Sequence, residues 1–146
     1  YDTMWYQVHE MLYIERGGED QIDGELEAYN PLIPQGSELI ATFMIEIENE
    51  DRRRGMLAKL GGVEECLSIR IGEVIIKAVA ERDLDRTTAE GKASSVHFVH
   101  FPFPDEAVAA FRRDGAEVIV AIDHPAYAHM AKMSEETLAA LAQDFD

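Results

Sequence analysis

The sequence has 146 residues and carries 29 Asp and Glu side chains against 13 Lys and Arg, a net charge of −16 at pH 7. Such a charge repels phosphate backbones and anionic lipid, so we expect no nucleic acid and no membrane surface among the partners. Cys66 is the only cysteine, which excludes an intrachain disulfide and fits a cytoplasmic protein. No apolar run approaches the roughly 20 residues that span a bilayer.

The length predicts a single domain over residues 1–146. Within it we separate a helical N-terminal segment, residues 1–33, from a sheet-containing core, residues 37–146. The sequence begins at Tyr1 rather than Met, inside a helical pattern, so we expect further residues upstream.

The opening residues have the apolar spacing of an amphipathic helix. Its apolar stripe is formed by Tyr1, Met4, Trp5, Val8, Met11 and Leu12. The next position on the stripe is Glu15, a carboxylate whose burial is unfavourable unless it is paired. Apolar residues on a second face predict that the helix is covered on two sides, by the sheet and by a second copy in a homodimer. Gly17 and Gly18 are expected to supply its left-handed cap.

Downstream of this helix the apolar pattern switches between helical spacing and a period of two. Capping residues, prolines and glycines mark where each element begins and ends. In chain order we predict a short helix from Asp20, a proline-broken connector over residues 30–36, a strand over 38–48, a helix from Asn49 to Gly61, a strand hairpin over 65–80 that turns at Gly72-Glu73, and a loop over 82–92.

Residues 94–103 are the densest aromatic segment and are apolar on both faces, which predicts a strand at the centre of a sheet covered on both sides. The remaining predicted elements are a helix from Pro104 to Gly115, a strand over 117–122 that ends before His124-Pro125, and a last helix capped by Ser134.

Residues 38–71 and 94–122 each run strand, acidic cap, short helix, glycine and strand. Two such units predict an α+β fold: a mixed, largely antiparallel five-stranded sheet with the N-terminal helices packed on it. The plan is that of a split βαβ sheet related to the ferredoxin-like fold, with right-handed crossovers wherever the flanking strands are parallel neighbours. A partly closed antiparallel barrel with short helices at its ends is the alternative.

His97 and His100 lie three residues apart on a predicted strand, so their side chains point to opposite faces. One of them could meet His124, which follows another strand, and a carboxylate from the first helix. Such a set suits iron, manganese or zinc, and the metal would activate water or bind a small anion. The predicted metal ligands are Glu10, Glu15, His97 and His124, and the wider ligand-binding set is Glu15, Arg16, His97, His124 and Tyr127.

Each of these residues also has a purely structural interpretation. A strand histidine is often bonded to backbone in the core, and the turn over 124–127 can exist without a ligand. Glu15 could form a salt bridge with a histidine or with Arg16, Arg70 or Lys92, or it could lie just past the buried region of the helix. His9-Glu10 is not the zinc-protease helix, because no second histidine follows at the required spacing.

Several strings of the sequence form a specific combination. Near the start are Gln7-Val8, Glu10-Met11-Leu12, Ile14-Glu15-Arg16 and Tyr29-Asn30-Pro31-Leu32-Ile33-Pro34, and later come Ser94-Ser95-Val96-His97-Phe98 and Asp123-His124-Pro125-Ala126-Tyr127. These strings resemble an uncharacterised bacterial family, the domain of unknown function 3501 family. The resemblance covers nearly the whole chain, and family members look longer at the N-terminus. Their genes are said to lie near rubrerythrin-like and iron–sulfur oxidoreductase genes, which implies an accessory role in redox or metal handling.

Two functions follow as hypotheses. The first is a non-catalytic accessory or binding protein of a bacterial redox or metal-handling system. Its partners would be a second copy, through the N-terminal helix, and a redox or iron–sulfur protein. The alternative is a small metal-dependent or anion-binding enzyme with a site of histidines and carboxylates.

Overall fold

The computed structural model describes residues 1–81 and 93–146, and the predicted loop over 82–92 lies outside them. The described residues form an α+β protein, as predicted. They divide into two compact units, the hairpin unit (residues 1–35) and the sheet unit (residues 36–146). The single domain over 1–146 and the packing of the N-terminal helices on the sheet stay predictions. Within the described residues, no helix is both long enough and apolar enough to cross a membrane.

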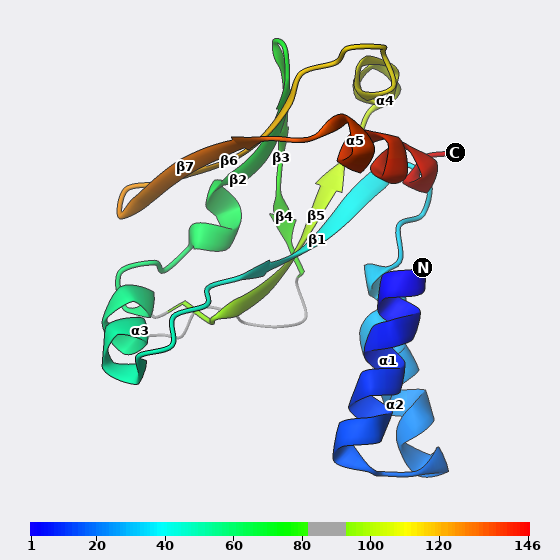
Figure 1. Cartoon of the computed structure of the whole chain (residues 1–146), viewed down its shortest axis with the longest axis vertical. Coiled ribbons are helices and arrows are strands. Elements are labelled where there is room, and N and C mark those ends of the chain that lie inside the picture. The colour runs from blue at the N-terminus through cyan, green and yellow to red at the C-terminus, as the bar shows by residue number, and fades with distance from the viewer. Residues whose placement is uncertain (82–92) are drawn as a thin grey trace. The chain divides into compact units, whose positions relative to one another are not determined.

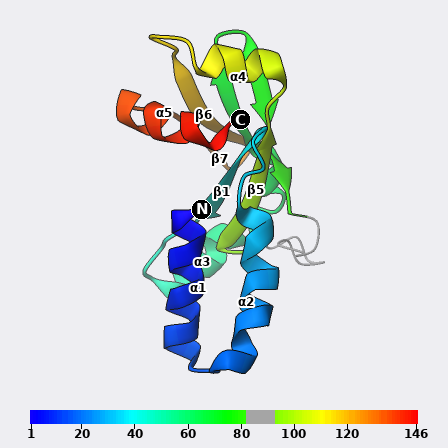
Figure 2. The same ribbon diagram turned by 90° about the vertical axis from the view of Figure 1, so that its right-hand side faces the viewer.

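The hairpin unit consists of two helices side by side (Figures 1 and 2). α1 spans Asp2–Glu15 and α2 spans Ile22–Tyr29, with short 3₁₀ turns at Glu19–Gln21 and Asn30–Leu32. α1 ends at Arg16, which takes the left-handed conformation with φ 56°. We predicted the left-handed cap at Gly17-Gly18, but it lies one residue earlier, at Arg16. A residue with a side chain is sterically strained in this conformation.

The apolar stripe of α1 is only partly covered. Val8 is buried and Leu12 is half-buried, whereas Trp5 is 55% exposed and Tyr1 is 72% exposed. Two short helices have too little volume for their surface to bury a complete stripe by themselves. The hairpin unit therefore presents apolar side chains that its own packing leaves open.

The sheet unit contains two antiparallel sheets where we predicted a single mixed sheet of five strands. Among its described residues, the first sheet has the order β1-β5-β4, with bounds β1 Glu38–Met44, β5 Val96–Pro102 and β4 Val79–Ala80. The second has the order β3-β2-β6-β7, with bounds β3 Val74–Lys77, β2 Leu67–Ile71, β6 Val118–His124 and β7 Tyr127–Lys132. β5 is the central strand of its sheet, as its two apolar faces predicted.

Both predicted strand–helix–strand units are present, but each changes sheets along the way. α3 (Glu50–Leu57) connects β1 to β2, and α4 (Asp105–Phe111) connects β5 to β6. β1 pairs with β5 and β2 pairs with β6, antiparallel in both cases, so neither unit is the parallel crossover of a split βαβ sheet. β3 continues past Ala78 into β4 and thereby passes from one sheet to the other. This arrangement is nearer to the antiparallel alternative.

β7 was missed in the sequence, where no element was assigned between the turn over 124–127 and the helix capped by Ser134. β6 continues to His124, and Pro125-Ala126 forms a two-residue turn into β7. All six residues of β7 are exposed at the edge of the sheet, so no alternation of apolar and polar residues marks them as a strand. The helix predicted after Ser134 is confirmed as α5 (Glu135–Leu141), with the Ser134 hydroxyl accepting the Thr137 N–H at 3.1 Å.

Both sheets contribute to one apolar core. Its buried side chains include Leu39, Val99 and Phe101 from the first sheet and Leu67, Ile69, Ile76 and Val118 from the second. Phe103, Phe111 and Phe145 pack together with ring centroids 4.8 to 5.7 Å apart. A smaller cluster of Leu57, Leu60, Val63 and Ala93 lies elsewhere in the unit. β5 is therefore held in place by packing, and its histidines have fixed positions.

Candidate functional site

β5 directs its two histidines to opposite faces, as predicted from their spacing. His97 lies on the face that also carries Val99 and Phe101, and it has no exposed surface. His100 lies on the other face and is partly exposed. The two imidazoles therefore belong to different environments.

His97 is buried next to a carboxylate that we did not predict. Its Nε2 lies 2.9 Å from the Ser94 carbonyl oxygen, which can only accept a hydrogen bond, so Nε2 carries a proton. Nδ1 lies 3.6 Å from Oε2 of Glu64, which belongs to the short 3₁₀ helix Val63–Cys66. Phe43 covers the ring at a centroid distance of 5.8 Å. His97 and Glu64 are therefore a buried pair of an imidazole and a carboxylate in close proximity.

His124 is fixed by its own surroundings. Its Nε2 donates to the Gly61 carbonyl oxygen at 3.2 Å, and its Nδ1 accepts the Ala126 N–H at 3.1 Å. This pattern corresponds to the neutral imidazole with its proton on Nε2. His124 and His97 thus both contact the segment Gly61–Cys66, His124 at its first residue and His97 at Glu64.

Cys66 ends the same segment, and its thiol donates to the Gly62 carbonyl oxygen at 3.5 Å. Burial raises the pKa of this thiol above its ordinary 9.0, and the charges of Glu65 and Asp123 raise it further. Since the thiolate is the reactive form, Cys66 is a weak nucleophile here.

His100 lies between two carboxylates. Its Nδ1 is 3.0 Å from Oε2 of Glu38 on β1, and its Nε2 is 2.7 Å from Oε2 of Glu81, which follows β4. Burial lowers the pKa of His100, but the two hydrogen bonds and the charges of both carboxylates outweigh burial, so its pKa is raised above the ordinary 6.5. The three side chains tie together β1, β5 and the end of β4.

The other predicted site residues are exposed. Glu15 is exposed at the end of α1 and accepts a hydrogen bond from Gln21 at 2.8 Å, so its interpretation as a buried carboxylate is wrong, whereas its interpretation as a position past the buried region agrees with the structure. Glu10 and Arg16 are exposed in the same unit. Tyr127 is 44% exposed and begins β7 rather than lying in a loop. Within the described residues, no three His, Cys, Asp or Glu side chains form a group that could hold a metal ion.

The sequence analysis overlooked the carboxylates that contact the histidines. Glu64 stands in the acidic pair Glu64-Glu65, which has the character of a solvated turn, yet only Glu65 is exposed. The signal available was the apolar Val63 directly before the pair, which is fully buried. Glu38 and Glu81 begin and follow strands, and the sequence does not show that those strands flank β5.

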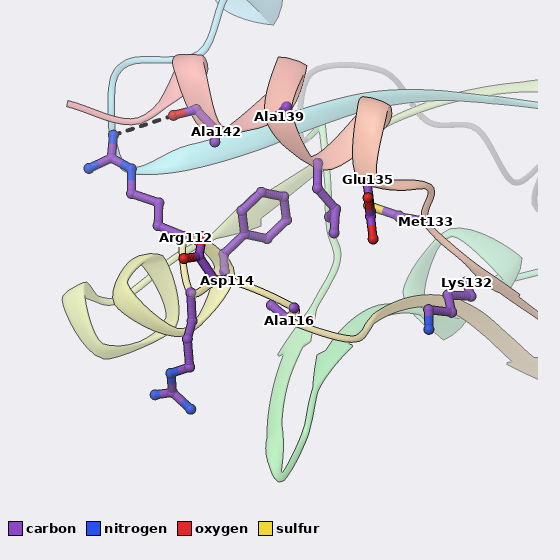
Figure 3. Close-up of a pocket in the computed structure, with 12 residues that line it drawn as sticks. Arg112, Asp114, Ala116, Lys132, Met133, Glu135, Ala139 and Ala142 are labelled. Atoms are coloured by element: carbon purple, nitrogen blue, oxygen red, sulfur yellow. Dashed lines mark hydrogen bonds between the residues drawn. The ribbon is translucent and has the colours of Figure 1, made fainter.

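The sheet unit has a cavity of about 390 Å³ between α4, the end of β7 and α5 (Figure 3). Its labelled polar residues include Arg112, Asp114, Lys132 and Glu135, so both signs of charge occur around it. Arg112 is occupied, since it donates to the carbonyl oxygens of Ala142, Phe145 and Asp146. Charged and apolar side chains are thus mixed in the lining of the cavity, as in an ordinary gap between packed elements.

The hairpin unit has a groove of about 270 Å³ with a different character. Its lining is almost entirely apolar and comes from both helices. The largest side chains in it are Tyr1, Met4, Trp5, Leu12, Leu26 and Tyr29. A lining of this kind favours contact with apolar groups of a ligand.

The chain has clear similarities to proteins of undescribed activity. A family model described as "Protein of unknown function (DUF3501)" matches residues 1–145. A crystal structure of a "novel protein of unknown function" from Burkholderia pseudomallei has 43% sequence identity and a TM-score of 0.87. The match covers 99% of this chain and 75% of that chain. No curated protein matches the chain.

Proposed function

This chain belongs to the DUF3501 family, as its sequence strings predicted, and from that premise we propose that it is a non-catalytic binding protein. It acts as an accessory to a bacterial redox or metal-handling system, and its partner there is a redox or iron–sulfur protein. Its proposed location is the cytoplasm, which suits a sequence with one cysteine.

The observation that supports a non-catalytic role is how the histidines are used. Five of the six ring nitrogens of His97, His100 and His124 lie within hydrogen-bond distance of groups of the chain itself, and the sixth, Nδ1 of His97, lies 3.6 Å from Glu64 without a hydrogen bond to any described residue. A nitrogen that is bonded to a backbone carbonyl is not available to bind a metal or to receive a proton from a substrate. These imidazoles serve to fix β5 and the segment Gly61–Cys66.

The support for binding is the exposed surface of the hairpin unit. Tyr6, Tyr13 and Ile14 of α1 are 62%, 77% and 63% exposed, in addition to the open groove. Large exposed apolar surfaces of this kind are typical of protein interaction sites. For the exposed side chains of α1 outside the groove, a second copy that pairs through α1 is the other partner that we propose.

Metal analysis tests the proposal. We expect protein purified under anaerobic conditions to hold far less than one iron, manganese or zinc ion per chain. A ligand that binds only the folded state raises the melting temperature. Because we expect no such binding, added metal should leave the melting temperature unchanged. A matched comparison is His97→Gln, which should respond to metal like the wild type. Stoichiometric metal that is lost in His97→Gln would overturn the proposal.

One observation favours the second candidate, a small metal-dependent or anion-binding enzyme. His97 and Glu64 lie 3.6 Å apart inside the protein, and a neighbouring imidazole and carboxylate are a combination that active sites use. The fit to a metal is poor, because this pair supplies two donors whereas zinc takes three or four from the protein. The same metal titration separates the two candidates.

A further inference from the structure

We propose that the groove of the hairpin unit binds a basic amphipathic helix of a partner protein. This inference rests on the proposed function, since it states which kind of partner the binding protein takes. Three properties of the hairpin unit carry it: the shape of the groove, the exposure of its lining and the charge around it.

The groove is suited to a helix. It is lined by α1 on one side and by α2 on the other, with Trp5 and Leu12 facing Leu26 and Tyr29. A third helix laid between two paired helices completes a bundle and packs its ridges into their groove. Its apolar anchors would recur with the spacing i, i+3 or i+4, and i+7.

The lining of the groove is left open in the chain itself. Trp5 is 55% exposed, Ile22 is 38% exposed and Leu26 is 39% exposed. Covering these side chains removes apolar surface from water, which is the main favourable term in association. The occupant must therefore present apolar side chains of its own.

The charge of the hairpin unit selects a basic occupant. Residues 1–35 contain one basic side chain, Arg16, and eight acidic ones, so that this quarter of the chain carries −7 of the total charge of −16. The acidic residues are Asp2, Glu10, Glu15, Glu19, Asp20, Asp23, Glu25 and Glu27. Lys and Arg side chains that flank the apolar anchors would be attracted by this net negative charge, and such complementarity speeds association and selects the partner.

The same charge argues against a second copy as the occupant. Two hairpin units brought together would each contribute seven net negative charges to one interface. Like charges that face each other across an interface disfavour the complex. We therefore assign the groove to a different protein with a basic helix.

Trp5 provides the test, because it is the only tryptophan of the sequence and lines the groove. The full chain is titrated with a synthetic helix of about 18 residues that carries a leucine stripe and lysines elsewhere. Two comparison peptides are used: one with glutamate in place of lysine, and one with the same composition as the lysine peptide in an order without the stripe. We expect only the striped lysine peptide to shift Trp5 emission to shorter wavelength, with affinity that falls as salt is added.

Two variants locate the site. Leu26→Ala shortens a groove residue and should weaken binding of the lysine peptide about tenfold. Ile75→Ala, which shortens an exposed residue of β3 in the sheet unit, outside the groove, should leave affinity within about twofold of the wild type. Circular dichroism confirms that both variants keep their helices, and the peptide comparison needs no variant at all.

Three outcomes would overturn the inference. They are equal binding of the lysine and glutamate peptides, equal loss in both variants, and a shift of Trp5 emission with protein concentration alone, which would identify a second copy as the occupant. A failure of the lysine peptide overturns this inference and leaves the proposed function in place. Stoichiometric metal overturns the proposed function whatever the peptides do.

Discussion

Oε2 of Glu64 lies 3.6 Å from Nδ1 of His97, inside the sheet unit, and the imidazole has no exposed surface. The Ser94 carbonyl holds the other ring nitrogen, so the imidazole cannot turn away from the carboxylate. In a setting with little water, two such groups affect each other strongly in either charge state.

A double-mutant cycle should detect this coupling. We expect His97→Leu alone to lower the free energy of unfolding by about 3 kcal/mol, because it removes one partner of a buried polar pair. The double variant His97→Leu/Glu64→Gln should lose about 1–3 kcal/mol less free energy of unfolding than the sum of the losses in the two single variants. Urea unfolding at neutral pH measures all four proteins, with Glu65→Gln, an exposed neighbour, as control. Strict additivity would show that the two groups do not interact.

The His100 site should make stability depend on pH. The pKa of His100 is raised in the folded state, so its contribution is fully present below the unfolded pKa of about 6.5 and is lost as pH rises through the folded value. His100→Gln should therefore be less stable than the wild type by about 1–2 kcal/mol near pH 6 and by less near pH 9. Urea unfolding at the two pH values measures the difference. His129→Gln, an exposed histidine of β7, is the control, and a difference for His100→Gln that is constant with pH would contradict the prediction.

Phe145 should be essential to the stability of the sheet unit. It is 4% exposed and packs on Phe103 and Phe111, and Arg112 donates to its carbonyl oxygen at 2.7 Å. Phe145→Ala should lower the free energy of unfolding by about 3–5 kcal/mol, as for other buried phenylalanines. Thermal and urea unfolding measure the loss, and Tyr127→Ala, at an exposed aromatic position, should cost under about 1 kcal/mol. Equal losses of unfolding free energy in the two variants would contradict the prediction that packing in the aromatic cluster stabilises the sheet unit.

The left-handed conformation of Arg16 predicts a substitution that stabilises the protein, in contrast to the preceding ones. Glycine removes the steric clash of the side chain at φ 56°, which stabilises the folded hairpin unit, but glycine also has a larger conformational entropy in the unfolded chain. The net effect of Arg16→Gly should be a stabilisation of up to about 1 kcal/mol. Gly18 has φ 70°, and Gly18→Ala should destabilise by a similar amount. Trp5 fluorescence in urea follows the hairpin unit directly. Destabilisation by Arg16→Gly would mean that its side chain makes contacts worth more than the strain.

The elements that carry strong periodic or capping patterns were predictable. α1, α5 after Ser134, the turn at Gly72 and the central position of β5 all follow from local residues, because burial or a cap selects those residues. β7 was not predictable in the same way. It is exposed on both faces at a sheet edge, so its residues are not selected for alternation.

Long-range pairing limited the prediction of the fold and the site. The strand–helix–strand repeat was visible, but whether β1 joins β2 or β5 depends on contacts between residues far apart in the chain, to which local periodicity is blind. The same holds for His100, whose carboxylates come from other strands. Glu15 was misjudged because its place on a stripe does not show whether α2 is long enough to cover it.

Phe145 also has a consequence for synthesis. Asp146 donates its N–H to Gly36, so the residues around Phe145 pair with the first residue of the sheet unit. A chain emerging from the ribosome has already made Phe103 and Phe111 long before Phe145 leaves the exit tunnel, and their apolar surface stays uncovered for that interval. Nascent chains should therefore expose this apolar surface to chaperones until Phe145 has emerged, and products that stop short of Phe145 should be degraded rather than accumulate.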